Sequence, residues 1–213
     1  MESWIGILES GFTRPLPGPA VQVRMAPSLR RPVVGDNLLK NGSVLILVYP
    51  YNGSLYTVFI KRTVYDGIHS GQVSFPGGMY EAGDDTPENT ALREAIEETG
   101  ISAKQTRIIG KLTSLHIPVS NTNVFPFVAV SQVRPEFRHD PAEVQYLIEA
   151  RLEELADPAT QCTKIMEVSG GNIEVPYYDI QGETIWGATA MITSEFLEVV
   201  RRAGSLYFPT RFL

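Results

Sequence analysis

The feature that most constrains this chain is a Gly-Gly pair followed by an acidic helical segment, within residues 71–101. Asp85 or Thr86 can cap the helix, and Pro87 suits its first turn. Gly100 suits the position just after a helix end, where the backbone turns left-handed. The sequence therefore predicts a helix that begins near Thr86 and ends before Gly100.

Three glutamates share one face of this predicted helix. Glu94, Glu97 and Glu98 stand at positions i, i+3 and i+4. Exposed like charges at this spacing repel by only about 0.2–0.5 kcal/mol, so a solvated acidic surface is one interpretation. The other is a partly buried cluster that a divalent cation neutralises, because magnesium prefers carboxylate oxygens, water and phosphate oxygens. The net charge of −6 favours a bound cation if the substrate is an anion.

The same residues resemble the signature of the Nudix hydrolases, G-x5-E-x7-R-E-U-x-E-E-x-G-U, in which U is a bulky aliphatic residue. Residues 93–101 match its second half, apart from Ala95 at the first aliphatic position. In the first half, six residues rather than five separate Gly78 from Asp85, and Asp85 stands where the family has glutamate. A shift of this kind is familiar in one branch of the family, the coenzyme A pyrophosphatases.

Residues upstream of the helix resemble the same branch, which carries L-L-T-x-R-[SA]-x3-R-x3-G-x3-F-P-G-G. The signature residues kept in register are Arg62, Gly71, Phe75, Pro76, Gly77 and Gly78. The chain departs at Ile60, Thr63 and Gly67, where the branch has threonine, serine or alanine, and a second arginine. The Gly67 departure affects substrate assignment most, because a guanidinium is the usual grip on a phosphate. Residues 16–18 and 185–189 also look like this branch.

The resemblance implies a Nudix fold of the α/β (α+β) class, a mixed β-sheet sandwiched between helices, with an N-terminal helical arm. It also implies that Glu94, Glu97, Glu98 and the Gly78 carbonyl ligate Mg²⁺ or Mn²⁺. Glu94, Arg93 and Glu98 are the candidate catalytic residues, with Glu94 preferred as the base that accepts a proton from water. Arg93 is expected to orient the glutamates, because it stands four residues before Glu97.

Substrate contacts are expected around the Gly-Gly pair, from Arg62, His69, Gln72, Gly77 and Gly78. Glu143 is the alternative base, since some Nudix enzymes draw the base from a segment beyond the signature. The competing interpretation of Glu143 is a capping box with Asp140 at the start of a second helix. For Trp186 and residues 177–178, stacking on a nucleotide base competes with packing in the core or a dimer.

The predicted organisation is an N-terminal helix and arm, residues 1–40, packed on a Nudix hydrolase domain of residues 41–213. The predicted strands cover residues 43–51, 55–62, 72–75, 111–118, 124–133, 163–168 and 173–180. Tight turns are expected at residues 51–54 and 169–172. Two more helices are predicted, over residues 140–155 from an apolar stripe and over residues 185–203. Pro126 predicts an edge strand or a bulge.

The leading functional prediction is a metal-dependent diphosphatase that cleaves coenzyme A or acyl-coenzyme A to 3′,5′-ADP and 4′-phosphopantetheine or its acyl form. The alternatives are hydrolysis of ADP-ribose, NADH or nucleotide triphosphates, and a non-catalytic binding module of the same fold. The partner is thus a small nucleoside diphosphate derivative. The acidic composition lacks the basic footprint of a nucleic-acid binder.

Location and assembly follow from weaker signals. The longest apolar run, residues 44–49, is too short to span a bilayer. The N-terminus has no basic region of the kind that opens a signal peptide, so we expect a cytoplasmic protein. The last predicted helix and the N-terminal arm are candidate surfaces for a homodimer.

Overall fold

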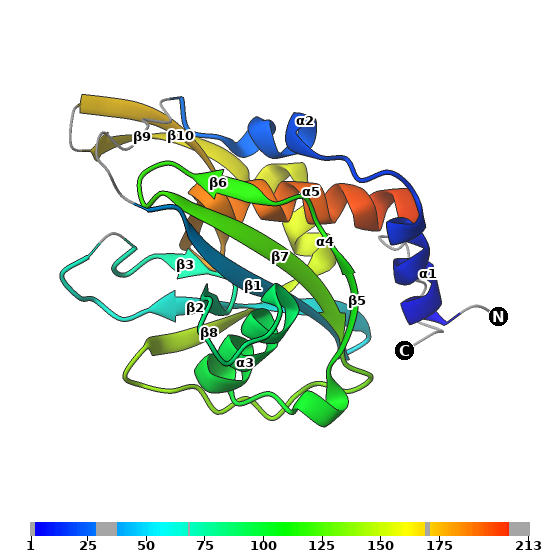
Figure 1. The fold of residues 1–213 in the computed structure, drawn as a ribbon. Coiled ribbons are helices and arrows are strands. Elements are labelled where there is room, and N and C mark those ends of the chain that lie inside the picture. Colours follow the sequence, from blue (N-terminus) through cyan, green and yellow to red (C-terminus); the bar gives the residue numbers. More distant parts are fainter. Residues whose placement is uncertain (1–2, 29–37, 68, 169–170, 205–213) are drawn as a thin grey trace.

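A large mixed β-sheet lies at the centre of the molecule, with helices on both of its faces (Figure 1). The computed structural model describes residues 3–28, 38–67, 69–168 and 171–204. The main path of the sheet is, in spatial order, β3 (Val73–Ser74), β2 (Ser54–Arg62), β1 (Lys40–Tyr51), β7 (Thr122–Val130) and β5 (Arg107–Lys111). Beside this path β4 (Gly77–Met79) pairs with β1, β6 (Leu115–Ile117) with β7, and β8 (Val144–Arg151) with β2. A second sheet has three strands in the order β11 (Glu183–Trp186), β10 (Gly171–Ile180), β9 (Gln161–Val168).

The helices divide between the two faces of the large sheet. They are α1 (Trp4–Ser10), α2 (Pro19–Gln22), α3 (Pro87–Thr99), α4 (Leu152–Ala156) and α5 (Gly187–Ala203). Short 3-10 turns occupy Gly11–Thr13, Val23–Met25, Ala103–Gln105 and Pro158–Thr160. Alternation along β1 separates two cores, because Leu45 and Leu47 pack with α3 while Ile46 and Val48 pack with the residues of α5. The predicted mixed sheet between helices is confirmed.

The local sequence predicted the first hairpin correctly. β1 and β2 pair antiparallel up to Tyr51 and Ser54. The two turn residues, Asn52 and Gly53, both have positive φ, 46° and 78°. These are the angles that the predicted tight turn requires. Of the second predicted turn, residues 169–170 lie outside the described residues, and the flanking strands β9 and β10 pair antiparallel as expected.

The predicted helix over residues 140–155 is wrong for most of its length. Residues 144–151 form β8, which pairs antiparallel with β2, and only the short α4 is helical. The buried positions Val144, Ile148 and Ala150 are all even-numbered, as they must be on one face of a strand. The apolar spacing also fitted a helix, and long-range pairing with β2 decided between the two.

Two predicted strands have different limits in the structure. Of the strand expected over residues 111–118, only Lys111, the last residue of β5, and residues 115–117, which form β6, are in strands. Both β5 and β6 pair with β7. The expectation that Pro126 marks an edge strand is wrong, because β7 lies between β1 and β5. Pro126 falls between the Val124 pair with β6 and the Phe127 pair with β5, where the antiparallel partner changes. Its missing N–H is tolerated at that gap.

The two ends of the chain also differ from expectation. The last helix begins at Gly187 rather than at residue 185, because residues 183–186 form β11. The predicted arm contains a short helix, α2, which begins right after Gly18 with Pro19 in its first turn. Residues 29–32 of the predicted arm lie outside the described residues. The division of the chain at residue 40 remains a prediction.

A buried carboxylate fastens the N-terminal arm to α5. Glu195 of α5 is fully buried and accepts hydrogen bonds from the Gly18 N–H at 3.0 Å and from Gln22 Nε2 at 2.8 Å. Thr113, between β5 and β6, donates to the same carboxylate from its hydroxyl at 2.7 Å. Burial of a charged group is tolerated because its oxygens are supplied with donors. Three segments far apart in sequence therefore meet at one side chain.

Candidate active site

The acidic helix α3 is held by the caps that the sequence predicts. The Thr86 hydroxyl accepts the Asn89 N–H at 3.2 Å, and Gly100 ends the helix with a φ of 72°. Ala91 and Ala95 are buried against the sheet. Glu94 and Glu98 lie along the edge of this buried face, where they meet strand β4.

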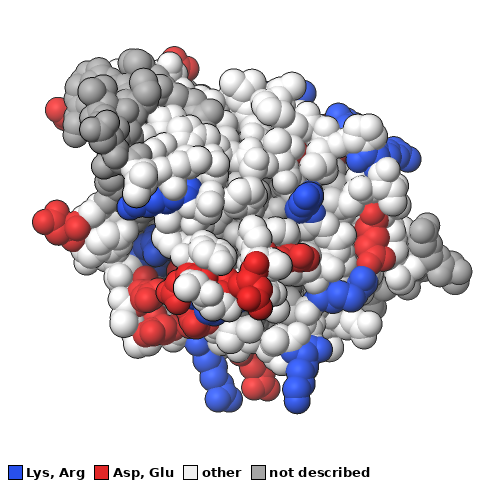
Figure 2. Space-filling view, in the orientation of Figure 1, with Lys and Arg blue, Asp and Glu red and all other residues white. Residues whose placement is uncertain are grey.

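The three glutamates do not form a uniformly solvated surface. The side chain of Glu98 is 1% exposed, that of Glu94 14%, and that of Glu97 58%. Like charges in such surroundings repel more strongly than on an open helix. Figure 2 shows acidic side chains gathered over the region of α3, with basic side chains beside them. The observed burial favours a functional cluster over a merely solvated surface.

The Gly-Gly pair in β4 permits a close approach between β1, β4 and α3. A Cβ on Gly77 would lie 2.2 Å from the Ser43 carbonyl oxygen, and a Cβ on Gly78 would lie 2.3 Å from Cδ of Glu94. The Gly77 N–H donates to Oε2 of Glu98 at 2.7 Å. Gly77 is therefore required by its contact with the β1 backbone, and a Cβ on Gly78 would displace the Glu94 carboxylate. The pair places the backbone directly against two of the predicted metal ligands.

Arg93 occupies the centre of the acidic cluster. Its Nη1 lies 3.1 Å from Oε1 of Glu94 and 3.0 Å from Oε2 of Glu97. Its Nε and Nη2 bind the two carboxylate oxygens of Asp84 at 2.8 and 3.0 Å. Nη2 also donates to the Met79 carbonyl at 3.1 Å. Arg93 thus links α3, β4 and the loop that carries Asp84.

The acidic residue beside Arg93 is not the one that was matched to the family's glutamate by position. Asp84, not Asp85, holds the guanidinium, and it is almost fully buried. It also accepts hydrogen bonds from the Thr90 hydroxyl and the Glu81 N–H. Asp85 is exposed with a φ of 51°. Five residues separate Gly78 from Asp84, which is the spacing of the family pattern between its glycine and its glutamate. Counting forward from Gly78, rather than back from Arg93, would therefore have identified Asp84.

Burial and mutual repulsion perturb the carboxylates. Burial raises the pKa of Glu98 to about 8, with smaller contributions in the same direction from Glu94 and Glu143, while Arg62 and the Gly77 N–H oppose the shift. Burial also raises the pKa of Glu94, Arg93 opposes this, and Glu97 and Glu143 add to it. Burial is thus the main cause of both shifts, and repulsion between the carboxylates adds to it.

The donor set fits a hard divalent cation in its chemistry. Glu94 and Glu98 supply carboxylate oxygens beside a glycine backbone, and these are the ligand types that Mg²⁺ and Mn²⁺ prefer. Among the described residues no three His, Cys, Asp or Glu side chains form a ready cluster for a metal ion. The reason is visible at Arg93, whose Nη1 holds Glu94 and Glu97; both side chains would rotate away from it to bind a cation.

Glu143 lies near the cluster but not in the predicted helix. The Thr63 N–H donates to the Glu143 carbonyl at 2.9 Å, which brings residues 140–144 beside the end of β2. The Glu143 carboxylate is exposed, and its charge acts on both Glu94 and Glu98. The capping-box interpretation is wrong, because Asp140 forms a turn onto the Ala142 N–H and no helix begins there.

A cleft of about 780 Å³ adjoins the glycine pair. All five predicted substrate-binding residues line it: Arg62, His69, Gln72, Gly77 and Gly78. Nδ1 of His69 lies 3.2 Å from Oε1 of Gln72, and Nη1 of Arg62 lies 3.4 Å from Oε1 of Glu98. Trp186 also lines the cleft, whereas Tyr178 is buried in the core. A volume of this size is typical of small-molecule sites.

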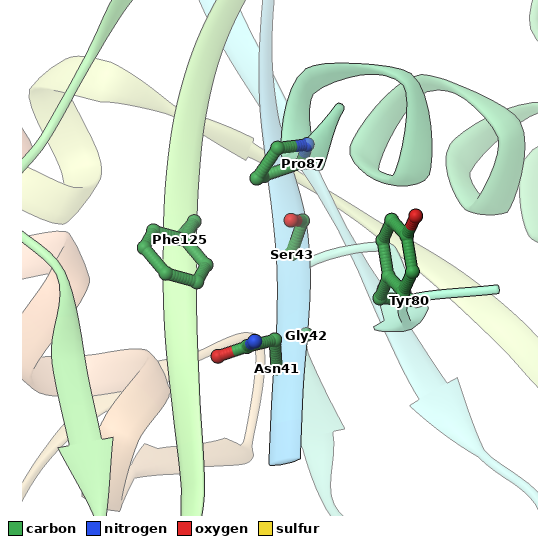
Figure 3. Close-up of a pocket in the computed structure, with 6 residues that line it drawn as sticks. All are labelled: Asn41, Gly42, Ser43, Tyr80, Pro87 and Phe125. Atoms are coloured by element: carbon green, nitrogen blue, oxygen red, sulfur yellow. The ribbon is translucent and has the colours of Figure 1, made fainter. Parts of the chain in front are cut away.

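Sequence reasoning did not single out Lys40 and Tyr65, which also line the cleft. Neither carries a local motif, and only the sheet register and the loop after β2 bring them there. A smaller pocket of about 170 Å³ lies where β1, β7 and the start of α3 meet, and Asn41, Tyr80 and Phe125 line it (Figure 3).

In the part of the chain that the structure describes, no helix is long and apolar enough to cross a membrane.

The comparisons with known proteins agree on one family. A family model described as NUDIX domain matches residues 39–165. A relative from Photorhabdus laumondii, named uncharacterized Nudix hydrolase NudL, is 32% identical over 133 residues, which are 62% of this chain and 71% of the relative. A protein of the same name from Yersinia pestis is 33% identical over 132 residues, which are 62% of this chain and 66% of that protein.

Two solved structures show a similar fold. A MutT/nudix family protein from Enterococcus faecalis has a TM-score of 0.54 at 15% identity, and the match covers 81% of this chain and 66% of that one. A Nudix hydrolase from M. smegmatis, RenU, has a TM-score of 0.50 at 17% identity, with 76% and 87% covered. At such identities the likeness concerns the fold alone.

Proposed function

The chain belongs to the Nudix hydrolase family, and we propose that its substrate is coenzyme A or an acyl-coenzyme A. As a Nudix diphosphatase it hydrolyses a phosphorus-containing acid anhydride. The proposed products are 3′,5′-ADP and 4′-phosphopantetheine or its acyl form. Mg²⁺ or Mn²⁺ is the proposed cofactor, since Nudix hydrolases generally use divalent metal ions.

The observation that carries this proposal is the mixed lining of the cleft. It includes polar groups suited to a diphosphate, namely Arg62 and the Gly77–Gly78 backbone. It also includes apolar side chains, among them Val119 and Met191. Coenzyme A has a nucleotide diphosphate joined to a long, largely uncharged pantetheine arm. A cleft with both kinds of wall suits that molecule better than a compact nucleotide triphosphate.

We assign the residues as the sequence suggested. Glu94, Glu97, Glu98 and the Gly78 carbonyl would hold the cation, which when bound neutralises the diphosphate and acidifies a water molecule. Glu94 is the base that takes a proton from the attacking water, while the water oxygen bonds to phosphorus and the bridging P–O bond breaks. Arg93 orients the glutamates through Asp84 and stands among them as a positioning residue.

Glu143 is retained as the alternative base. Its charge acts on both Glu94 and Glu98, so its carboxylate belongs to the same electrostatic cluster. The variants Glu94→Gln and Glu143→Gln distinguish the two, because removing the base should lower kcat by about a hundredfold or more. If Glu94→Gln keeps near wild-type turnover and Glu143→Gln does not, the base is Glu143.

The second candidate function is hydrolysis of another nucleoside diphosphate derivative, such as ADP-ribose or NADH. The departures at Gly67 and Ile60 favour it, since the branch signature has arginine and threonine there. The decisive experiment incubates the protein with Mg²⁺ or Mn²⁺ and with coenzyme A, ADP-ribose, NADH or a nucleotide triphosphate. Appearance of 3′,5′-ADP at the highest rate in the panel supports our proposal. Faster cleavage of another substrate, with coenzyme A intact, contradicts it.

Location and assembly complete the proposal. We propose a cytoplasmic enzyme and a homodimer that uses α5 or the N-terminal arm. The arm already covers part of α5, through Gly18 and Gln22 on Glu195. A monomeric mass in light scattering would contradict the dimer.

A further inference from the structure

In the loop after β2, the Tyr65 ring lies where a side chain at position 67 would begin, and Gly67 itself supplies no cation. A Cβ built on Gly67 would lie 2.4 Å from Cε2 of Tyr65. The Tyr65 ring thus occupies the space in which a longer side chain would begin, and Tyr65 itself lines the cleft. A second cationic contact with the substrate therefore has to come from another part of the cleft wall.

Lys40 is the basic side chain of the cleft wall that can bind a substrate anion. Of the other basic side chains there, Arg62 lies 3.4 Å from the buried Glu98 carboxylate, and His69 is hydrogen-bonded with Gln72. None of the ion pairs formed among the described residues involves Lys40. Its ammonium can therefore meet a substrate anion without first breaking an internal ion pair.

Strand register directs Lys40 to the cleft and sets its distance from the glycine pair. Lys40 lines the cleft, whereas its neighbour Asn41 lines only the smaller pocket (Figure 3), as expected for successive side chains on opposite faces of a strand. Gly78 pairs with Ser43, three residues beyond Lys40. At about 3.3 Å per residue, the two positions are roughly 10 Å apart along the strand. When the diphosphate lies beside Gly78, Lys40 can therefore bind a second anionic group of the same molecule.

We propose that Lys40 determines specificity by binding the 3′-phosphate of coenzyme A, in place of the arginine missing at position 67. This inference rests on the proposed function. In coenzyme A a ribose ring separates the diphosphate from the 3′-phosphate, so the two anionic groups are offset as Gly78 and Lys40 are. An ammonium ion on a flexible stem reaches such a phosphate as a point charge.

The test compares coenzyme A with dephospho-coenzyme A, which lacks only the 3′-phosphate. The variant Lys40→Met removes the charge and keeps an unbranched stem, and Lys40→Arg keeps the charge. We expect the ratio of kcat/KM for the two substrates to favour coenzyme A in the wild type and to fall by about tenfold to a hundredfold in Lys40→Met. Lys40→Arg should retain most of the preference. Lys104→Met, on an exposed turn outside the cleft, is the matched control and should leave the ratio unchanged.

The outcomes separate this inference from the proposed function. One outcome is that the wild type cleaves both substrates while Lys40→Met lowers kcat/KM equally for both, or for neither. In that case Lys40 does not bind the 3′-phosphate, and only the inference is wrong. If the wild type cleaves ADP-ribose and neither coenzyme A nor dephospho-coenzyme A, the proposed function is wrong and the inference is overturned with it. Thermal unfolding of each variant identifies any loss that comes from misfolding.

Discussion

The carboxylate of Glu98 and the backbone N–H of Gly77 are joined by a 2.7 Å hydrogen bond between α3 and β4. This bond fixes a buried, predicted metal ligand against the strand that lines the substrate cleft. The proposed cation ligands and the cleft are thus connected through one short strand.

The first prediction concerns the charge of Glu98. Glu98→Gln keeps an oxygen that can accept the Gly77 N–H but removes the negative charge, so we expect a fold that is intact and a kcat reduced about a hundredfold or more. Steady-state kinetics at saturating Mg²⁺ and a thermal unfolding curve measure the two effects. A variant with wild-type kcat would remove Glu98 from the metal site.

The second prediction separates Asp84 from its neighbour. Asp84→Asn removes the charged partner of Arg93, and because outer-shell partners of metal ligands matter by about 10- to 100-fold, kcat should fall by that amount. Asp85→Asn, one residue later and exposed, should change kcat less than about twofold. Equal effects of both substitutions would show that Asp84 does not position Arg93.

The third prediction tests the contact between Gly78 and Glu94. Gly78→Ala places a methyl group 2.3 Å from Cδ of Glu94, so the carboxylate has to move and activity should fall at least about tenfold. Gly83→Ala is the control, since a Cβ there meets nothing within 4 Å. Comparable activities of the two variants would mean that Glu94 tolerates the displacement and that its observed position is not the active one.

The fourth prediction concerns stability in acid. The guanidinium of Arg201 lowers the pKa of Glu198 to about 2, burial opposes this shift, and Arg202 adds to it. A carboxyl with a lowered folded-state pKa stabilises the fold above its ordinary value of 4.5 and loses that stabilisation as the pH falls toward 2. Because both arginines are partly exposed, the stabilisation at neutral pH is about 1 kcal/mol or less.

Chemical denaturation of Glu198→Gln between about pH 7 and pH 2 checks this assignment. The variant should be less stable than wild type at neutral pH and should lose less free energy of unfolding on acidification. Glu136→Gln is the control, since the carboxylate of Glu136 is 91% exposed. Parallel stability curves for wild type and Glu198→Gln would contradict the assignment.

The sequence was sufficient wherever structure is determined locally. Thr86, Pro87 and Gly100 predict α3, and Asn52-Gly53 predicts the first hairpin, because caps and turns depend on neighbours along the chain. It failed for β8, because the apolar spacing of residues 144–155 fits a helix as well as a strand. Only β2, which lies about 90 residues earlier and needs a partner along its edge, decides between them.

The site divides in the same way. The glutamates, Arg93 and the glycine pair follow from a contiguous pattern, and the structure brings them together. Asp84 was missed because one extra residue before the helix shifts the pattern, and the geometry of Arg93 reveals which aspartate is used. Lys40 was missed because nothing local marks it, and the register of β1 with β4 and β7 brings it to the cleft.

The carboxylate of Glu195 links residues that leave the ribosome far apart in time. Gly18 donates to a residue 177 positions later, in the last helix of the described chain. During translation the N-terminal arm is therefore complete long before its anchor exists, and the apolar residues Leu8 and Val21 lack their native cover until α5 emerges. Long-range contacts of this kind delay folding until the closing segment is available. A nascent chain stalled before residue 195 would consequently hold its arm unattached, exposed to chaperones and proteases.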